Sequence, residues 1–332
     1  FRLSIIQFLP DRVIHLVCLN KLNFSKKRFA VFIMLLQISS LTFLGKISAE
    51  EEKQFVLWTF ADIQPRNDDE REDFEITVED VIKNKLQVDA AVCAGDMVQL
   101  SSSQNHDDEW KWFYRTVEPL AIKNFYEIIG NHDARNIPLY FKYTKKPMHY
   151  AVRFGNLLLI LLSDEKNSSG TDISDNAFLW WKKLVEENQS NIIITITHSH
   201  LGGTGFSYNY PSYRNVVDSE RFTEVLKKQR VDYWLFGHTH VPSTFKGKNR
   251  KINSLGGTHF INIAAIREDY FLSFAESKFF YFTPGSDVLT IKTRNHRKNK
   301  FMSSIEIREK MKTAFVYDGS VPEFIEFRDK DK

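Results

Sequence analysis

Short apolar runs alternate with amphipathic segments along most of the chain after residue 53. The runs have the length and composition of strands that are buried on both faces of a sheet. They cover residues 54–60, 88–96, 124–133, 191–200 and 231–240. Helices are predicted between them, because apolar residues recur there at helical spacing. The predicted helices cover residues 68–87, 106–120, 174–189 (with Ser174 as the expected N-cap) and 218–230.

The pattern changes near residue 148 and again after residue 258. Residues 148–165 contain two strand-like runs that meet at Gly155-Asn156, which is a hairpin signal. Strand-like runs then dominate, at 258–266, 278–283 and 287–295. Alternating strands and helices followed by strands predict an α/β sandwich with a mixed sheet, in one domain over residues 53–296. The charged residues 297–332 are expected to form a C-terminal extension.

The first 49 residues have the features of an export signal. Basic residues 26–28 precede the apolar run 29–36, and residues 47–49 offer a cleavage site before Glu50. We therefore expect a signal peptide over residues 22–49 and an exported protein, periplasmic or extracellular. The first methionine is Met34, so residues 1–21 are expected to be untranslated upstream sequence or disordered.

An uncleaved membrane anchor is the alternative for this segment. Polar residues between 37 and 42 make the apolar span short for a bilayer, which favours cleavage. Any contact of the protein with a membrane is expected only through this segment.

Basic residues are concentrated in the same leader. Residues 1–49 carry seven Lys or Arg and one acid, which leaves 38 basic and 41 acidic residues and a net charge of −3 for the rest. A slightly acidic body has no general attraction for nucleic acid, so no nucleic-acid partner is expected. Cys93, the only cysteine after the leader, lies in an apolar run and is predicted to be a small core residue.

Side chains that bind metals follow five of the predicted strands. Ligands of open α/β sheets bind at the carboxyl ends of the strands, so these side chains are expected to converge on one crevice. Oxygen and nitrogen ligands without thiolate suit Mn, Zn, Fe or Mg, and their number suits two ions better than one. Gly95, Gly130 and Gly237 precede three of these groups and are predicted to let the backbone turn sharply. The side chains are Asp62, Gln64, Asp96, Asn131, His132, Asp133, His198, His200, His238 and His240.

Five motifs in this order resemble those of the calcineurin-like metallophosphoesterase superfamily. They are FADIQ (60–64), AGDMV (94–98), IIGNHD (128–133), ITHSH (196–200) and FGHTH (236–240). The resemblance covers residues 55–265 and implies a four-layer α/β/β/α sandwich of mixed sheets. One such motif is weak evidence, whereas five in the right order at strand ends are strong evidence.

The resemblance also implies a role for each matching residue. Two divalent ions about 3.5–4 Å apart would be bridged by Asp96, with Mn preferred and Fe, Zn or Mg as alternatives. A water or hydroxide between them would attack phosphorus in line. His132 would protonate the leaving oxygen or stabilise the charge that develops there. The first ion would be held by Asp62, Gln64 and His240, and the second by Asn131, His198 and His238.

The sequence departs from the family pattern at two positions. Gln64 stands where histidine is usual, and its neutral amide oxygen is expected to favour Mn or Mg and to weaken the first site. Gln99 stands where the family often has Asp or Asn to orient the catalytic histidine. It can form a hydrogen bond there but cannot supply charge.

The segment 201–215 lies between two ligand-bearing strands and is expected to overhang the crevice. Tyr208, Tyr210 and Arg214 are candidates for stacking on a base or sugar or for binding phosphate, and ordinary packing is the alternative for each. His200 is equally open to substrate contact and to solvation in a loop.

Together these features predict an exported phosphoesterase that hydrolyses a phosphomonoester or phosphodiester of a small molecule. The Asp-Ile-Gln motif also looks like that of some nucleotide-sugar and alcohol diphosphatases of the superfamily. The alternative is a weakly active or non-catalytic binding protein that keeps the fold, for which Gln64 is the best argument. A nuclease of the same superfamily is disfavoured by the acidic body and the export signal.

Overall fold

A computed structural model describes residues 53–101, 105–204, 212–245, 249–267 and 275–328. They belong to one compact unit that begins at Lys53. The predicted signal peptide (22–49) and the segment 1–21 lie outside the described residues, as do Tyr208 and Tyr210. No helix in the described ranges is long and apolar enough to cross a membrane.

The first sheet has seven strands in the order β12-β11-β10-β1-β2-β3, with β13 also paired to β11. Strands β1, β2 and β3 run parallel to one another, and β10 is antiparallel to β1. The strands are β1 (Phe55–Phe60), β2 (Ala90–Cys93), β3 (Phe125–Glu127), β10 (Glu276–Phe282), β11 (Val288–Asn295), β12 (Lys300–Phe301) and β13 (Ile307–Lys310).

The second sheet also has seven strands, in the order β14-β4-β5-β6-β7-β9-β8. Strands β5, β6, β7 and β9 are parallel, and β4 and β5 form the hairpin predicted at Gly155-Asn156. The strands are β4 (His149–Phe154), β5 (Leu157–Leu162), β6 (Ile192–Thr197), β7 (Tyr233–Phe236), β8 (Arg250–Ile252), β9 (Thr258–Asn262) and β14 (Glu323–Glu326).

The central strands are buried on both faces, as their uninterrupted apolar sequences predict. Successive side chains of a strand point to opposite faces. Leu157, Leu159 and Leu161 of β5 therefore belong to the core between the two sheets, whereas Leu158 and Ile160 belong to the core under the outer helices. Cys93 is buried in the core on the outer face of the first sheet, as predicted.

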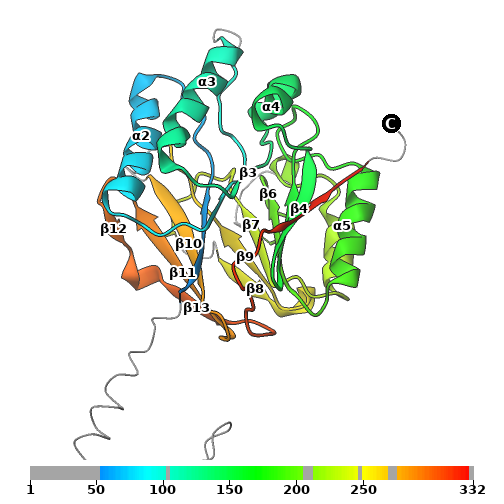
Figure 1. Ribbon diagram of the computed structural model, residues 1–332. Coiled ribbons are helices and arrows are strands. Elements are labelled where there is room, and N and C mark those ends of the chain that lie inside the picture. Colours follow the sequence, from blue (N-terminus) through cyan, green and yellow to red (C-terminus); the bar gives the residue numbers. More distant parts are fainter. Residues whose placement is uncertain (1–52, 102–104, 205–211, 246–248, 268–274, 329–332) are drawn as a thin grey trace, which may run out of the picture. The chain divides into compact units, whose positions relative to one another are not determined.

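Helices cover the outer face of each sheet (Figure 1). The first sheet carries α2 (Asp68–Lys83), α3 (His106–Val117) and the unpredicted α4 (Ile137–Thr144). The second carries α5 (Asp175–Glu187) and α6 (Ser219–Leu226). Ser174 caps α5 by accepting a hydrogen bond from the backbone N–H of Ala177 at 3.4 Å. The predicted four-layer α/β/β/α sandwich is confirmed.

Both sheets continue past residue 296, where a charged extension was expected. Strands β12 and β13 extend the first sheet, and β14 pairs with β4 at the edge of the second, with Glu323 opposite Arg153. Charged side chains are common on edge strands, because they prevent pairing with other chains. Composition alone therefore does not distinguish these edge strands from a tail.

Candidate metal centre

The loops that follow β1, β2, β3, β6 and β7 bring the predicted ligands together from both sheets. Asp62 and Gln64 follow β1, Asp96 follows β2, and His198 follows β6 directly. Ligand atoms of two overlapping sets lie within 4.8 Å of one another. One set is Asp96, His198 and His238, and the other is Asp62, Asp96 and His240. The predicted convergence on one crevice is thus present, with Asp96 common to both sets.

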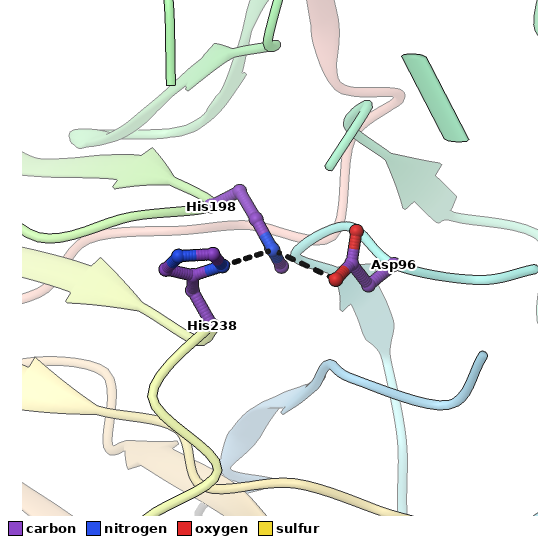
Figure 2. Close-up of side chains that lie close together, drawn as sticks. All are labelled: Asp96, His198 and His238. Carbon is purple, nitrogen blue, oxygen red and sulfur yellow. Dashed lines mark hydrogen bonds and ion pairs between the residues drawn. The ribbon is translucent and has the colours of Figure 1, made fainter. Parts of the chain in front are cut away.

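We name one set of candidate ligands the second-metal pocket; it consists of Asn131, His198, His238 and the shared Asp96. Figure 2 shows three of these side chains, Asp96, His198 and His238. Asp96 Oδ2 lies 3.1 Å from His198 Nε2, and His198 Nε2 lies 3.2 Å from His238 Nδ1. The opposite nitrogen of His198, Nδ1, lies 2.8 Å from the carbonyl oxygen of Ala94. Such a carbonyl fixes the proton on Nδ1 and leaves Nε2 for a cation.

We name the other set the first-metal pocket; it consists of Asp62, Gln64, His240 and the shared Asp96. It lies on the other side of Asp96. Asp62 Oδ1 is 3.2 Å from His240 Nε2. The Gln64 amide nitrogen lies between two acceptors, 3.1 Å from Asp96 Oδ2 and 3.1 Å from His240 Nε2. Asp96 Oδ2 therefore faces both pockets, as a bridging ligand would.

Unpartnered oxygens show that these residues fit divalent cations. Oε1 of Gln64 and Oδ1 of Asn131 are buried and have no hydrogen-bond partner among the described residues. A half turn of the Gln64 amide exchanges its nitrogen and oxygen and directs the oxygen at the first-metal pocket. Buried oxygens without donors are costly unless a cation satisfies them. The donor set contains oxygen and nitrogen and no thiolate, which matches the expected hard or borderline cations.

Left-handed backbone conformations aim four of the ligands. The φ angles are 57° at Asp62, 54° at Asp96, 63° at His238 and 49° at His240. Each such residue costs about 1–3 kcal/mol, and residues of this kind cluster at functional sites. The strain is supported locally, because the backbone N–H of His238 donates to both carboxylate oxygens of Asp62, at 3.0 and 2.8 Å.

The three glycines of the motifs serve two different purposes. Gly95 has a φ of 90°, so it provides the sharp turn that the sequence predicts. Gly130 and Gly237 do not have a positive φ, so a left-handed backbone is not the reason for glycine there. A Cβ atom on Gly130 would lie 2.3 Å from Asp96 Oδ1, and one on Gly237 would lie 2.5 Å from Asp62 Oδ2. These two glycines make room for the carboxylates.

The electrostatics of the centre favour ionised carboxylates. Burial raises the pKa of Asp96, but His198 and His132 outweigh burial and hold that pKa well below its ordinary value. Burial lowers the pKa of His198, but the Asp96 and Asp62 carboxylates outweigh it and raise that pKa to about 10. The proton on His198 Nε2 must leave before this atom binds a cation, so cation affinity is expected to fall as pH falls.

His132 lies beside Asp96 with its ring partly exposed. Its backbone N–H donates to Asp96 Oδ1 at 2.8 Å, and its Nε2 lies 3.9 Å from Asp96 Oδ2. The ring is oriented by the backbone carbonyl of Gln99, 3.4 Å from Nδ1. The Gln99 side chain was expected to do this, but its buried Oε1 has no partner among the described residues.

Two residues near the ligands have supporting contacts that the sequence did not predict, although Asp133 was counted there among the metal-binding side chains. The buried Asp133 accepts hydrogen bonds from the backbone N–H groups of Asp96, Met97, Val98 and Gly130, at 2.8–3.1 Å. It thereby ties the loop after β2 to the loop after β3, and burial together with Asp96 raises its pKa to about 7. Its place in the GNHD motif was the available signal. The other residue is Arg267, which contacts the first-metal pocket and lies outside all five motifs.

Two of the candidates for substrate binding, His200 and Arg214, lie in different surroundings. His200 is 3% exposed and packs against Phe236, with its ring centre 5.4 Å away, so it is not solvated. Burial lowers the pKa of His200 to about 4. Arg214 lies at the metal centre, where its Nε donates to His238 Nε2 at 3.3 Å.

Comparisons with known proteins agree with this geometry. The family model of the calcineurin-like phosphoesterases matches residues 55–242, more than half of the chain. A search of curated protein sequences found no match to this chain.

Three solved structures share the fold at low identity. A dimetal phosphatase from Danio rerio is 12% identical with a TM-score of 0.60, and the match covers 77% of this chain and 98% of that one. A purple acid phosphatase from yellow lupin (Lupinus luteus) is 14% identical with a TM-score of 0.54, covering 78% and 54%. GAP50, the anchor in the inner membrane complex of Plasmodium, is 14% identical with a TM-score of 0.55, covering 80% and 91%. On the strength of the family match, and with a fold that agrees, this chain belongs to the calcineurin-like phosphoesterase family.

Proposed function

We propose that this protein is a dinuclear metal-dependent phosphoesterase that hydrolyses a phosphomonoester or phosphodiester of a small molecule. The observation that carries the proposal is the position of Asp96. Its Oδ2 lies 3.1 Å from His198 Nε2 in one pocket and 3.1 Å from the Gln64 amide in the other. A single carboxylate between two sets of ligands is the arrangement of a two-metal hydrolase.

Each pocket has its own donors for a cation. Asp62, Gln64 and His240 would hold the first ion, Asn131, His198 and His238 the second, and Asp96 both. Mn is the preferred metal, because four of the seven donors are oxygen and two of these four are neutral amides, and Fe, Zn or Mg are the alternatives. When bound, two such ions supply the charge that activates water and neutralises the phosphate oxygens.

The protein's own residues then act on the substrate from the rim of the centre. His132 directs Nε2 toward the crevice while the Gln99 carbonyl accepts from Nδ1, so Nε2 can deliver a proton to the leaving oxygen. Burial lowers the pKa of His132, and the nearby Asp96 carboxylate opposes this effect. Arg214, which lies close to His238, would bind a phosphate oxygen.

A weakly active or non-catalytic binding protein is the second candidate. It is favoured by Gln64, which offers an amide where the family usually has a histidine ligand. The two candidates differ in turnover, since both retain a pocket with His198, His238 and Asp96.

The test is a substrate comparison with metal-loaded protein. Residues 50–332 are loaded with Mn and assayed with para-nitrophenyl phosphate, its bis ester and nucleotides, with metal-free protein as the control. Mn-dependent turnover of any of these supports an esterase, and the preferred ester shows whether it is a monoesterase or a diesterase. Two bound metals without turnover on any substrate would favour the binding protein.

Export is also proposed, on the basis of the leader alone. If residues 22–49 are cleaved, mass spectrometry of the exported protein should find Glu50 at the amino terminus. Recovery of the intact leader in the membrane fraction would support the anchor instead. A phosphorylated small molecule remains the proposed partner, and no binding to nucleic acid is expected from the acidic body.

A further inference from the structure

Arg267 contacts all three residues that belong to the first-metal pocket alone. Its backbone N–H donates to the carbonyl oxygen of Asp62 at 3.0 Å. Its Nη1 donates to the carbonyl oxygen of Gln64 at 2.7 Å, and its Nη2 lies 3.5 Å from Nδ1 of His240.

The guanidinium is held in place from its other side. The Arg267 side chain is 7% exposed, and its Nε lies 4.0 Å from a carboxylate oxygen of Glu70 in α2. The neighbouring Ile266 donates its backbone N–H to Ala61, so the segment that carries Arg267 runs along the loop after β1. Arg267 therefore couples the loops that follow β1, β7 and β9 to a helix of the outer layer.

We infer that Arg267 is the positioning residue of the first-metal pocket, an inference that rests on the proposed dinuclear site. Gln64 is a weak ligand of this pocket, because its amide oxygen is neutral and stands where the family usually has an imidazole. Its oxygen reaches a cation only if the backbone at residue 64 is held where Arg267 holds it. The planar fork of arginine can contact a carbonyl and an imidazole together, whereas lysine offers a single flexible point charge.

The positive charge of Arg267 has an effect opposite to its positioning contacts, because it disfavours cation binding. A fixed cation beside a metal pocket repels the incoming ion. Binding through His240 Nε2 also requires the proton on Nδ1, and a guanidinium can only donate to that atom. Positioning and repulsion therefore predict opposite effects when Arg267 is replaced, which makes them separable.

The experiment is an Mn titration of the wild-type protein, Arg267→Met and Arg267→Lys by equilibrium dialysis, with electron paramagnetic resonance to distinguish paired from isolated Mn. If Arg267 positions the pocket, both variants should bind the ion of the first-metal pocket about 10–100-fold more weakly, as is typical when an outer partner of a metal ligand is lost. The paired signal should be replaced by that of an isolated ion at Mn concentrations where the wild type holds two.

Controls separate this inference from the proposed function. Arg308→Met removes an exposed arginine that pairs with Glu306 and should leave the titration unchanged. Retained binding of the tighter Mn equivalent, which is expected in the second-metal pocket, shows that a variant is folded. Arg267→Lys preserves the size and charge of the side chain if Arg267→Met does not fold.

Two outcomes would overturn the inference. Tighter binding in Arg267→Met with unchanged binding in Arg267→Lys would show that only the charge matters. Equal binding in all three proteins would show that Arg267 has no part in the pocket. A wild type that binds fewer than two ions would instead refute the dinuclear site.

Discussion

The two halves of the metal centre share Asp96 but differ in what lies behind their histidines. In the second-metal pocket, His198 is fully buried and its outer nitrogen meets the Ala94 carbonyl at 2.8 Å. In the first-metal pocket, the side chain of His240 is 13% exposed and its outer nitrogen faces the Arg267 guanidinium. A carbonyl stabilises the proton that a metal-binding imidazole carries on its outer nitrogen, whereas a guanidinium opposes it.

His238 of the second-metal pocket also faces a guanidinium, that of Arg214. The second-metal pocket therefore has one imidazole backed by a carbonyl, His198, and one backed by a guanidinium, His238. The first-metal pocket has only one imidazole, which is backed by a cation, and it has a neutral amide in place of a second. Similar numbers of donors thus predict unequal affinities, with the second-metal pocket filled first.

Asp96→Asn should have the largest effect, because it removes the ligand that both pockets share. Mn affinity should fall in both by more than the roughly 10–100-fold that follows loss of an outer partner. Esterase activity should fall to that of metal-free protein. Equilibrium dialysis and initial rates measure this, with the exposed Asp287→Asn as a control. Turnover that survives Asp96→Asn would contradict the shared ligand.

His132→Ala should separate proton transfer from metal binding. Both ions should remain, because the contact of residue 132 with Asp96 Oδ1 is made by its backbone N–H. With an alkyl phosphate, kcat should fall by about 10²–10⁴-fold, the usual contribution of a general acid. With para-nitrophenyl phosphate the loss should be much smaller, since that leaving group needs no proton. Equal losses on both substrates would argue against an acid role.

His198→Ala and His240→Ala test the inequality of the pockets directly. The wild-type Mn titration should show two steps separated by at least about 10-fold, within the range that outer partners produce. His198→Ala should abolish the tight step, and His240→Ala should abolish the weak one and leave the tight one intact. The reverse pattern would show that the first-metal pocket is the stronger.

Gln64→His should have the smallest effect and should reduce the difference between the pockets. An imidazole in place of the amide should raise Mn occupancy of the first-metal pocket, by about 10-fold at most because the Arg267 charge remains. Elemental analysis at limiting Mn measures the occupancy. Unchanged or lower occupancy would count against Gln64 as the weak ligand.

The strands themselves could be predicted from the sequence where burial is complete. Strand β5 is apolar at every position and β1 at every position but Thr59, because each face meets a core. The sequence did not identify β8, β12, β13 and β14, which are short and largely charged or exposed. These strands form through pairing with their neighbours, and their own composition resembles that of a loop.

The sequence alone predicted which side chains converge on the candidate metal centre, because strand ends of an α/β sandwich deliver them to one edge. Their orientation and support depend on the tertiary structure. His132 is oriented by the backbone carbonyl of Gln99, and Gly130 and Gly237 make room for carboxylates from other loops. Arg267 reaches Gln64 across 203 positions of the chain. No local pattern encodes such contacts, since they exist only after the loops that follow β1, β7 and β9 have packed together.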